Sequence, residues 1–315
     1  MKTPVKIPHD KLKVTSIDLR PTIEQMGLAV KNQNPRGTCS VFASTFLLEY
    51  MTCKTRSLGI SCQTWPGDQK RSIDFSEEYL NSVANLARKQ LGMTEQNPDG
   101  DTFQGCWWGY RDFGIVGEEW FPYQQTYDSN MKPDDFLLET GKLARFFKAN
   151  IIFSENTPTT TDGSPKGFNE DQLHSVISRL DDNVPVAFGV HISSTLTVKN
   201  FGSLSIWDDY SDETKSACGH SIAIVGYYSS VFVPSGGYFI FRNSYGGEWG
   251  DKGYGYLSFN FARKHVYDVV AYDTKLKPIP WIEMPKKESR IELPPPPWHL
   301  MGKLGELIHP YSRLR

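Results

Sequence analysis

The order of hydrophobic patterns along the chain constrains its fold more than any other feature. The first half carries helical periodicity, whereas the second half carries short apolar runs separated by glycine-rich turns. Helices that precede antiparallel strands favour an α+β protein with two segregated lobes. A cleft between two lobes is a usual place for a binding site, so the same pattern indicates where function should lie.

Helical periodicity is clearest in three segments of the first half. Residues 39–55 place apolar side chains at helical spacing and contain no proline or glycine. A second helix should follow Ser76, which can cap a helix N-terminus ahead of two glutamates. A third is predicted over residues 102–113, with Gly114 as its stop. The predicted strands of the second half cover residues 184–190, 220–228, 238–242, 254–259 and 266–272.

Composition divides the 315 residues into a body and a tail. Residues 1–15 are a lysine-bearing lead, residues 16–127 a mainly helical lobe and residues 128–273 a mainly β lobe. Residues 274–315 hold eight of the twenty prolines and an excess of basic residues, which favours an extended segment. This C-terminal tail is either a strap or loose end, or a segment that docks on the body or on a partner and inhibits the protein.

Charge and hydropathy disfavour several function classes. A net charge of −2 offers no basic face to nucleic acid, and no apolar run approaches the length of a membrane helix. The N-terminus lacks the apolar stretch of a secretory signal, so a cytoplasmic location is the default, with non-classical secretion left open. Neither His-Glu-x-x-His nor Cys-x-x-Cys occurs, so we expect no metal and no cofactor.

The chain has an odd number of cysteines, so at least one thiol lacks an intramolecular partner. The five cysteines are Cys39, Cys53, Cys62, Cys106 and Cys218. A chain of this length does not need disulfides to fold, and reduced thiols are the default. One or two disulfides remain open, and Cys53 and Cys62 are the closest pair in sequence.

Cys39, His220 and Asn243 have the residue types of a thiol nucleophile, its base and the group that orients the base. Cys39 opens the first predicted helix, where unpaired amides and the helix dipole stabilise a thiolate. His220 opens an apolar strand, and Asn243 ends another strand at a glycine-rich turn. Taken singly, each residue also fits a structural role in packing, at a strand end or in a turn.

Around these three residues the chain resembles the papain-like cysteine peptidases, and the resemblance extends over residues 16–273. Among them it is most similar to bacterial-type members that lack a propeptide. Gln33 lies six residues before Cys39, which is the family's spacing between its oxyanion-hole glutamine and its nucleophile. The histidine strand at residues 219–227 and the Asn-Ser block at residues 242–250 follow in the family's order. Further matching segments are residues 17–20, 37–42, 75–80, 114–123 and 253–254.

The resemblance implies a papain-like fold with a helical left lobe, an antiparallel β-barrel-like right lobe and the active-site cleft between them. Cys39 would attack a peptide carbonyl as a thiolate paired with the His220 imidazolium, and Asn243 would orient His220. The Gln33 side chain and the Cys39 backbone N–H would stabilise the oxyanion on the way to an acyl-enzyme. Trp249 would shield the His220–Asn243 hydrogen bond from water.

The chain departs from the family pattern near the expected cleft. Ser40 and Tyr245 stand where the family has tryptophans, which alters the cleft wall. Arg36 stands where the family has a cysteine of its first disulfide, so that bridge cannot form. Only about 15 residues precede the body, too few for a long inhibitory propeptide, so the enzyme would be made active, be trimmed or be inhibited by its tail.

Substrate-binding residues are carried over from the family by position. The glycine pair that lines the cleft falls at Gly100 and Asp101. Asp101 would bring a carboxylate near the substrate backbone and favour basic or small residues, unless it is an exposed loop acid. The remaining substrate-binding positions are Gly189, Ser221, Tyr245 and Trp249, of which Gly189 and Ser221 are small and would leave a roomy second subsite.

The separation of the nucleophile and its base exceeds the papain pattern. Cys39 and His220 are 181 residues apart, whereas the papain-type spacing is about 130 to 150. The excess predicts surface insertions, and residues 52–72 and 128–169 are the expected hosts.

The sequence predicts a cysteine peptidase that acts on protein or peptide substrates, without nucleic-acid or membrane partners. The same triad serves acyltransferases and deamidases, which differ in the acceptor of the acyl group. A catalytically idle homologue that only binds is the alternative from another class, although the intact catalytic set argues against it. A toxin or secreted effector is a role that would also fit such an enzyme.

Overall fold

Helices account for most of the described chain before residue 143, and strands for most of it afterwards. The computed structural model describes residues 14–56, 73–93, 98–154, 169–193, 196–210 and 218–274. The helices are α1 (Arg20–Gln25), α2 (Cys39–Arg56), α3 (Glu77–Gln90), α4 (Phe103–Phe113), α5 (Asp135–Lys142), α6 (Glu170–Asp181) and α7 (Phe259–His265). The strands are β1 (Thr15–Asp18), β2 (Phe147–Ser154), β3 (Val186–Ile192), β4 (Leu196–Phe201), β5 (Leu204–Tyr210), β6 (Cys218–Ser229), β7 (Gly237–Arg242), β8 (Tyr254–Ser258) and β9 (Val266–Thr274). This distribution confirms the predicted α+β class.

These nine strands form one sheet in the order β2-β9-β3-β6-β7-β8-β5-β4, with β1 beside β6. Neighbouring strands are antiparallel except for β5 and β8. The sheet stays open along this path, so the β part of the fold is an extended sheet that does not close on itself. β6 is its longest strand, and β3 and β1 pair with successive parts of one β6 edge.

The three predicted helices begin within one residue of the expected positions, and α2 and α4 also end within one residue of them. Ser76 caps α3 by accepting a hydrogen bond from the Tyr79 backbone N–H, and Thr102 caps α4 in the same way. α4 ends at Gly114, whose φ is 72°. A Cβ at this position would lie 1.8 Å from the Gly141 carbonyl oxygen, so only glycine fits both the backbone conformation and the space.

The five predicted strands correspond to β3, β6, β7, β8 and β9. The sequence analysis missed the other strands and helices α1, α5, α6 and α7, although α6 carries a readable signal in the reciprocal capping box of Asn169 and Gln172. Residues 128–169, an expected insertion, contain α5 and β2, and β2 pairs with β9 at one end of the sheet. The other expected insertion beyond Arg56, the loop at 157–165 and the tail beyond Thr274 lie outside the described residues.

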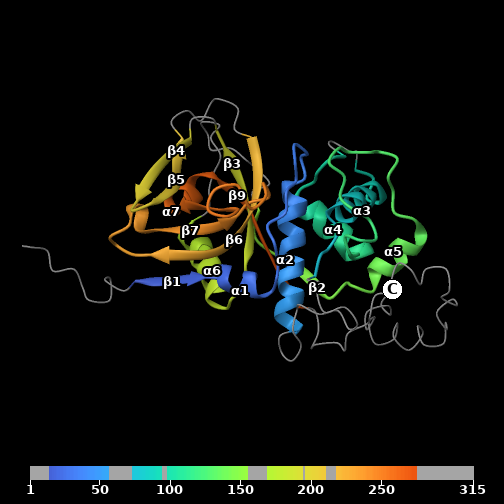
Figure 1. Cartoon of the computed structure of the whole chain (residues 1–315), viewed down its shortest axis with the longest axis horizontal. Helices are drawn as coiled ribbons and strands as arrows, with labels where there is room; N and C mark the ends of the chain where they lie inside the picture. Colours follow the sequence, from blue (N-terminus) through green and yellow to red (C-terminus); the bar gives the residue numbers. More distant parts are fainter. Residues whose placement is uncertain are drawn as a thin grey trace, which may run out of the picture. The chain divides into compact units, whose positions relative to one another are not determined.

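Helix α2 joins the helical and β parts of the fold. It packs against β3, β6 and β9 on one side and against α3 and α4 on the other, as Figure 1 shows. Residues on both sides of the helix, including Leu47 and Leu48, are fully buried, which a helix between two layers requires. The chain enters through β1, which already lies in the sheet beside β6. The division of lobes at residue 127 stays a prediction.

Aromatic side chains fill the sheet's buried face. Phe239 on β7 is fully buried, and its ring centroid lies 5.5 Å from that of Phe188 and 4.8 Å from that of Phe259. These contacts join three parts of the β half that are separate in the chain: β3, β7 and the start of α7. None of the helices in the described ranges combines the length and the apolar character needed to cross a membrane.

We predict that Phe239→Ala destabilises the protein by about 3–5 kcal/mol, because it leaves a cavity between two packed rings. Phe232→Ala is the matched control, since Phe232 is 73% exposed, and it should change the unfolding free energy by less than about 0.5 kcal/mol. Urea unfolding monitored by circular dichroism measures both. Equal effects of the two substitutions would contradict this assignment of the core.

Candidate active site

Cys39 is the first residue of α2 and its thiol is partly exposed. The helix begins here because the Phe42 backbone N–H donates to the Thr38 carbonyl, which starts the helical ladder. Burial raises the pKa of the Cys39 thiol, and hydrogen bonds with the side chain and backbone of Ser221 on β6 counteract this rise. The thiol of the helical part therefore meets the strand that carries His220.

His220 and Asn243 form the hydrogen bond that the sequence analysis predicted. His220 Nε2 lies 2.9 Å from Asn243 Oδ1, and the same oxygen accepts the Ser244 backbone N–H at 2.9 Å. Because Oδ1 acts as an acceptor, His220 Nε2 donates, and the other ring nitrogen, Nδ1, is left to accept a proton. This tautomer suits a base whose Nδ1 receives the proton of a nucleophile.

Burial favours the uncharged forms of both Cys39 and His220. It lowers the pKa of His220, and the Asn243 hydrogen bond only partly opposes this effect. It raises the pKa of Cys39 at the same time. Both shifts favour the neutral thiol of Cys39 and the neutral imidazole of His220, because water no longer solvates the charges. The thiolate–imidazolium pair stays a prediction, and its formation has to overcome this desolvation.

An aromatic stack covers the base. The Tyr245 ring lies on the His220 imidazole, with centroids 5.1 Å apart and planes at 24°, and Tyr245 is 42% exposed. Trp249 packs edge-on against Tyr245 at 6.0 Å. Tyr245 is thus the ring in direct contact with His220, and Trp249 supports that ring. The shielding role predicted for Trp249 remains untested.

Gln33 is buried beside the loop that carries Asn243. Its backbone N–H donates to the Ser244 carbonyl at 2.9 Å, and its side-chain Oε1 accepts the Ser244 hydroxyl at 2.5 Å. Its Nε2 donates to the Arg36 carbonyl at 2.6 Å. The orientation of the Gln33 amide is therefore fixed at both ends. One N–H of the Nε2 group is engaged, and the second is the donor that an oxyanion would need.

A pocket of about 270 Å³ opens beside Cys39. The structure brings five of the predicted catalytic and substrate-binding residues to its walls: Cys39, Gly100, Asp101, Gly189 and Ser221. Its other walls come partly from Asn85 and Arg88 on α3 and from Tyr267 and Asp268 on β9, which the sequence analysis missed. Only the pairing of β9 with β3, which sets Asp268 opposite Gly189, reveals these last two residues.

The structure explains why two of the pocket positions hold the residues they do, Gly189 and Asp101. A Cβ at Gly189 would lie 2.7 Å from the Tyr267 ring, so glycine allows that ring to pack on the strand. The Asp101 side chain is 2% exposed, and both carboxylate oxygens accept from Arg88 Nε at 2.7 Å. Asp101 is a buried partner of Arg88, and its negative charge is matched before any substrate binds.

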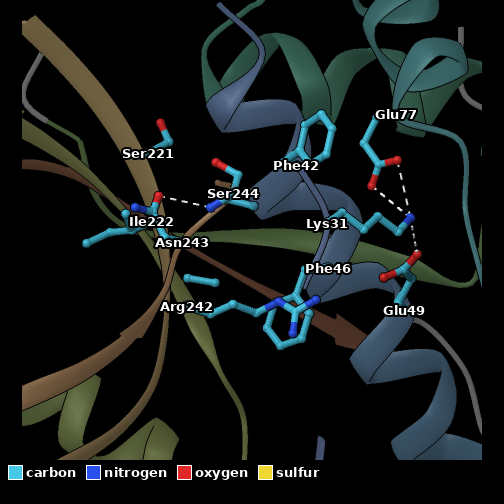
Figure 2. Close-up of a pocket in the computed structure, with 12 residues that line it drawn as sticks. Lys31, Phe42, Phe46, Glu49, Glu77, Ser221, Ile222, Arg242, Asn243 and Ser244 are labelled. Carbon is cyan, nitrogen blue, oxygen red and sulfur yellow. Dashed lines mark hydrogen bonds and ion pairs between the residues drawn. The ribbon is translucent and has the colours of Figure 1, made fainter. Parts of the chain in front are cut away.

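Behind the site, Lys31 is surrounded by carboxylates, and Figure 2 shows it between Glu49 and Glu77. Lys31 Nζ lies 2.8 Å from Glu49, 2.9 Å from Glu77 and 2.7 Å from Asp74. Burial alone would lower the pKa of Lys31, but these carboxylates raise it well above its usual value. Burial raises the pKa of Glu77 to about 8, and Lys31 only partly offsets this. One cation faces more carboxylates than it can neutralise, so the cluster retains protons near neutral pH.

The lysine cluster and the site share a cavity of about 20 Å³, large enough for one water molecule. Asn243 and Ser244 line it from the sheet side, as Figure 2 shows. Beside it, Arg242 donates to the Leu28 carbonyl at 3.0 Å, and its guanidinium lies 4.5 Å from the Phe46 ring centroid. The end of β7 is therefore tied both to the segment that leads to Gln33 and to α2.

The structure also shows the state of the cysteines and the position of Ser40. Cys39, Cys106 and Cys218 are free, Cys53 is disulfide-bonded, and Cys62 lies outside the described residues. Ser40 donates its hydroxyl to the Asp101 carbonyl at the pocket wall. Within the described ranges, no group of three or more His, Cys, Asp or Glu side chains is arranged to hold a metal ion.

Comparison with family models identifies one family. The model of the papain family of cysteine proteases matches residues 14–272. No curated protein sequence gives a match. The similarity to solved structures is low in sequence and extends over most of the chain.

Three of these solved structures illustrate the sequence identity, TM-score and coverage of the matches. Xylellain, a cysteine protease from Xylella fastidiosa, is 16% identical with a TM-score of 0.56, and the match covers 87% of this chain and 90% of that one. Procathepsin L 3 of the Tenebrio molitor larval midgut is 20% identical with a TM-score of 0.50, over 84% and 71% of the two chains. The proform of the ragweed pollen cysteine protease Amb a 11 is 19% identical with a TM-score of 0.52, over 85% and 67%. These likenesses show that the fold is shared.

We predict a pH-dependent effect of Glu77→Gln on stability. Burial raises the pKa of Glu77 in the folded protein to about 8, whereas in the unfolded chain the carboxyl releases its proton near its usual pKa of 4.5. Its contribution to stability is therefore complete below about pH 4.5 and is lost as the pH rises towards 8. Glutamine cannot ionise, so the stability of the variant relative to the wild type should rise between pH 5 and pH 8. The slope for one proton is at most about 1.4 kcal/mol per pH unit.

Urea unfolding at several pH values measures this difference. Glu24→Gln is the matched control for the substitution itself, because Glu24 is exposed on α1. A difference for Glu77→Gln that stays constant or falls with rising pH would show that Glu77 is not protonated in the folded state.

Proposed function

Because the chain belongs to the papain family of cysteine proteases, we propose that it hydrolyses peptide bonds through a triad of Cys39, His220 and Asn243. The observation that carries the proposal is the hydrogen bond of His220 Nε2 to Asn243 Oδ1, whose direction the Ser244 N–H fixes. It leaves Nδ1 of His220 as the basic atom. The Ser221 contact of Cys39 supports the same assignment, since Ser221 follows His220 on β6.

The reaction begins with transfer of the Cys39 thiol proton to His220 Nδ1. The sulfur then attacks the peptide carbonyl carbon, and the carbonyl π electrons move to the oxygen. The second N–H of Gln33 Nε2 and the Cys39 backbone N–H donate to this oxyanion. When the C–N bond breaks, His220 returns its proton to the leaving amine. Water activated by His220 then attacks the thioester, which releases the acid and restores the thiol.

The position of Cys39 at the start of α2 favours the charge-separated step. The free N–H groups of the first turn and the helix dipole stabilise a thiolate, which opposes the effect of burial on the thiol. The Asn243 carbonyl oxygen accepts from Nε2 and stabilises the imidazolium. A substrate carbonyl held over the helix N-terminus develops its negative charge close to these same donors.

The 270 Å³ pocket is where the acyl side of a peptide would bind. It lies between α3 and the β3–β9 pair, and its floor includes Gly189, Ser221 and Tyr267. The aromatic ring and the small residues leave room for a sizeable side chain. Because Arg88 already neutralises Asp101, the selectivity for basic residues that the sequence suggested receives no support from Asp101 itself.

We predict that an epoxysuccinyl thiol-peptidase inhibitor labels Cys39 and that His220→Ala reduces this labelling by at least about tenfold. Cys218 is an exposed free thiol two residues before His220, so the experiment uses a Cys218→Ser background. Peptide mass spectrometry locates and quantifies the adduct. His174→Ala is the control, because His174 is exposed on α6.

A second experiment uses a peptide substrate. It measures the turnover rate and shows whether water or an added amine accepts the acyl group. Peptide cleavage by the wild type with loss in His220→Ala supports hydrolysis. Transfer of the acyl group to an added amine in preference to water would replace hydrolysis by acyl transfer. No labelling and no turnover would overturn the proposal in favour of a binding protein.

We predict that Gln33→Ala lowers kcat by about 10² to 10³, because it removes one oxyanion donor. KM should change far less, since the ground-state carbonyl bears little charge. Steady-state kinetics on a peptide amide measure the effect, and Gln125→Ala at an exposed position is the control. If kcat were unchanged, Gln33 would not be an oxyanion donor.

A further inference from the structure

Arg36 lies three residues before Cys39 and is almost completely buried, with a side chain that is 3% exposed. Its Nη1 donates to Glu78 on α3 at 2.5 Å and to the Gln124 carbonyl at 2.7 Å. Its Nε donates to Asp99 at 2.8 Å. The guanidinium therefore connects the loop before the nucleophile to three other parts of the helical region.

The backbone of Arg36 is linked directly to the proposed oxyanion donor. Its carbonyl oxygen accepts a hydrogen bond from Gln33 Nε2 at 2.6 Å. Among the described residues this carbonyl is the one partner of that NH₂ group. Because the side chain of Arg36 is anchored in three directions, its carbonyl has a fixed position from which it orients the Gln33 amide.

Tyr123 links the same two residues by a second path. The Arg36 guanidinium lies 4.5 Å above the Tyr123 ring centroid, a cation–π contact. The Tyr123 hydroxyl lies 2.8 Å from the Gln33 carbonyl, to which it donates, and 2.7 Å from the Thr38 hydroxyl. A single buried cation thus supports the loop of residues 33–38 through both its backbone and a stacked ring.

We propose that Arg36 is a positioning residue for catalysis: its ion-pair network fixes the Arg36 carbonyl, which holds one N–H of Gln33 and so aims the other at the oxyanion. This inference rests on the proposed function. A cysteine at this position would fix the loop by a covalent bond, and that bond cannot form here. Instead of that bond, the ion pairs of Arg36 with Glu78 and Asp99 hold the loop, and Glu78 is as deeply buried as Arg36.

Removing Arg36 alone would confuse two effects. Arg36→Met leaves the Glu78 carboxylate buried without its cation, which destabilises the fold in addition to releasing the loop. The informative variant is Arg36→Met/Glu78→Gln, which removes both charges and restores an uncharged interior. If Arg36 acts only through stability, activity should recover in this double variant together with the unfolding midpoint. If it positions Gln33, stability should recover and catalysis should not.

The experiment compares two reactions of Cys39. In the first reaction, the Cys39 sulfur adds to the carbonyl carbon of a peptide aldehyde. The carbonyl oxygen becomes an oxyanion, which takes up the thiol proton and is then the hydroxyl of a hemithioacetal. Iodoacetamide forms a carbon–sulfur bond and releases iodide, without an oxyanion. We expect Arg36→Met/Glu78→Gln to lower kcat and weaken aldehyde inhibition by at least about tenfold each, and to change KM and the alkylation rate by less than about threefold.

Three further variants make the test specific. In a Gln33→Ala background the double substitution should have no further effect on kcat, because its target is absent. Arg36→Lys keeps the positive charge, but an ammonium group cannot form all three contacts of the guanidinium. It should therefore give an intermediate loss of kcat, and this result can be measured even if the double variant fails to fold. Arg179→Met, which breaks a partly exposed ion pair with Asp273, should leave every parameter near the wild type.

Wild-type kcat or aldehyde inhibition in Arg36→Met/Glu78→Gln would overturn the proposal, as would a parallel fall of alkylation and turnover. In both of these cases the wild type still turns over substrate, so the proposed function stands. An inactive wild type whose Cys39 is not alkylated faster than a surface thiol would instead overturn the proposed function and this inference with it.

Discussion

The backbone pairing of residues 31–33 with residues 244–246 is the contact on which the site depends. The Gln33 N–H donates to the Ser244 carbonyl, and the Gly246 N–H donates to the Lys31 carbonyl. One segment leads into α2 and the nucleophile, and the other continues from β7 and carries Asn243. Two hydrogen bonds between these segments therefore set the distance between the helical and β contributions. Side chains reinforce the pairing from both sides, with Lys31 bound to α2 and α3 and Arg242 bound to the chain before Lys31.

Charge is distributed unequally around this pairing. The helical side buries cations, and each has carboxylates within hydrogen-bond distance: Lys31 has Glu49 and Glu77, and Arg36 has Glu78. Buried ion pairs of this kind contribute little net stability, but they tolerate few alternative arrangements because an unpaired charge is costly. Within the described residues, Cys39 and His220 have no ion pair of this kind: burial raises the pKa of Cys39 and lowers that of His220, and only hydrogen bonds with Ser221 and Asn243 oppose these shifts. The fixed charges thus specify the geometry around the pairing of the two segments.

Prediction from the sequence succeeded where local signals are strong. Helices α2, α3 and α4 have apolar periodicity and defined ends, and strands such as β6 and β7 are nearly continuous apolar runs. Strand β4 escaped prediction because four of its six residues are exposed, and β5 because polar residues interrupt its apolar ones; only their pairing reveals both strands. Tyr267 and Asp268 escaped for a related reason, since no local pattern shows that β9 lies beside β3 at the pocket. Asp101 was recognised by position, but its burial against Arg88 could not be read from the sequence.

The sequence by itself determined the α+β class, the starts of the three main helices and the papain-family motifs in their order along the chain. These are properties of local periodicity, capping and motif spacing, which depend on neighbours within a few residues. Only the tertiary structure decided which nitrogen of His220 meets Asn243, how the Gln33 amide is held and which carboxylates surround Arg36. Each of these depends on a hydrogen bond or ion pair between residues far apart in the chain. Such partners become neighbours only when the core packs, because side-chain chemistry alone does not specify which of many carboxylates or carbonyls a buried group will meet.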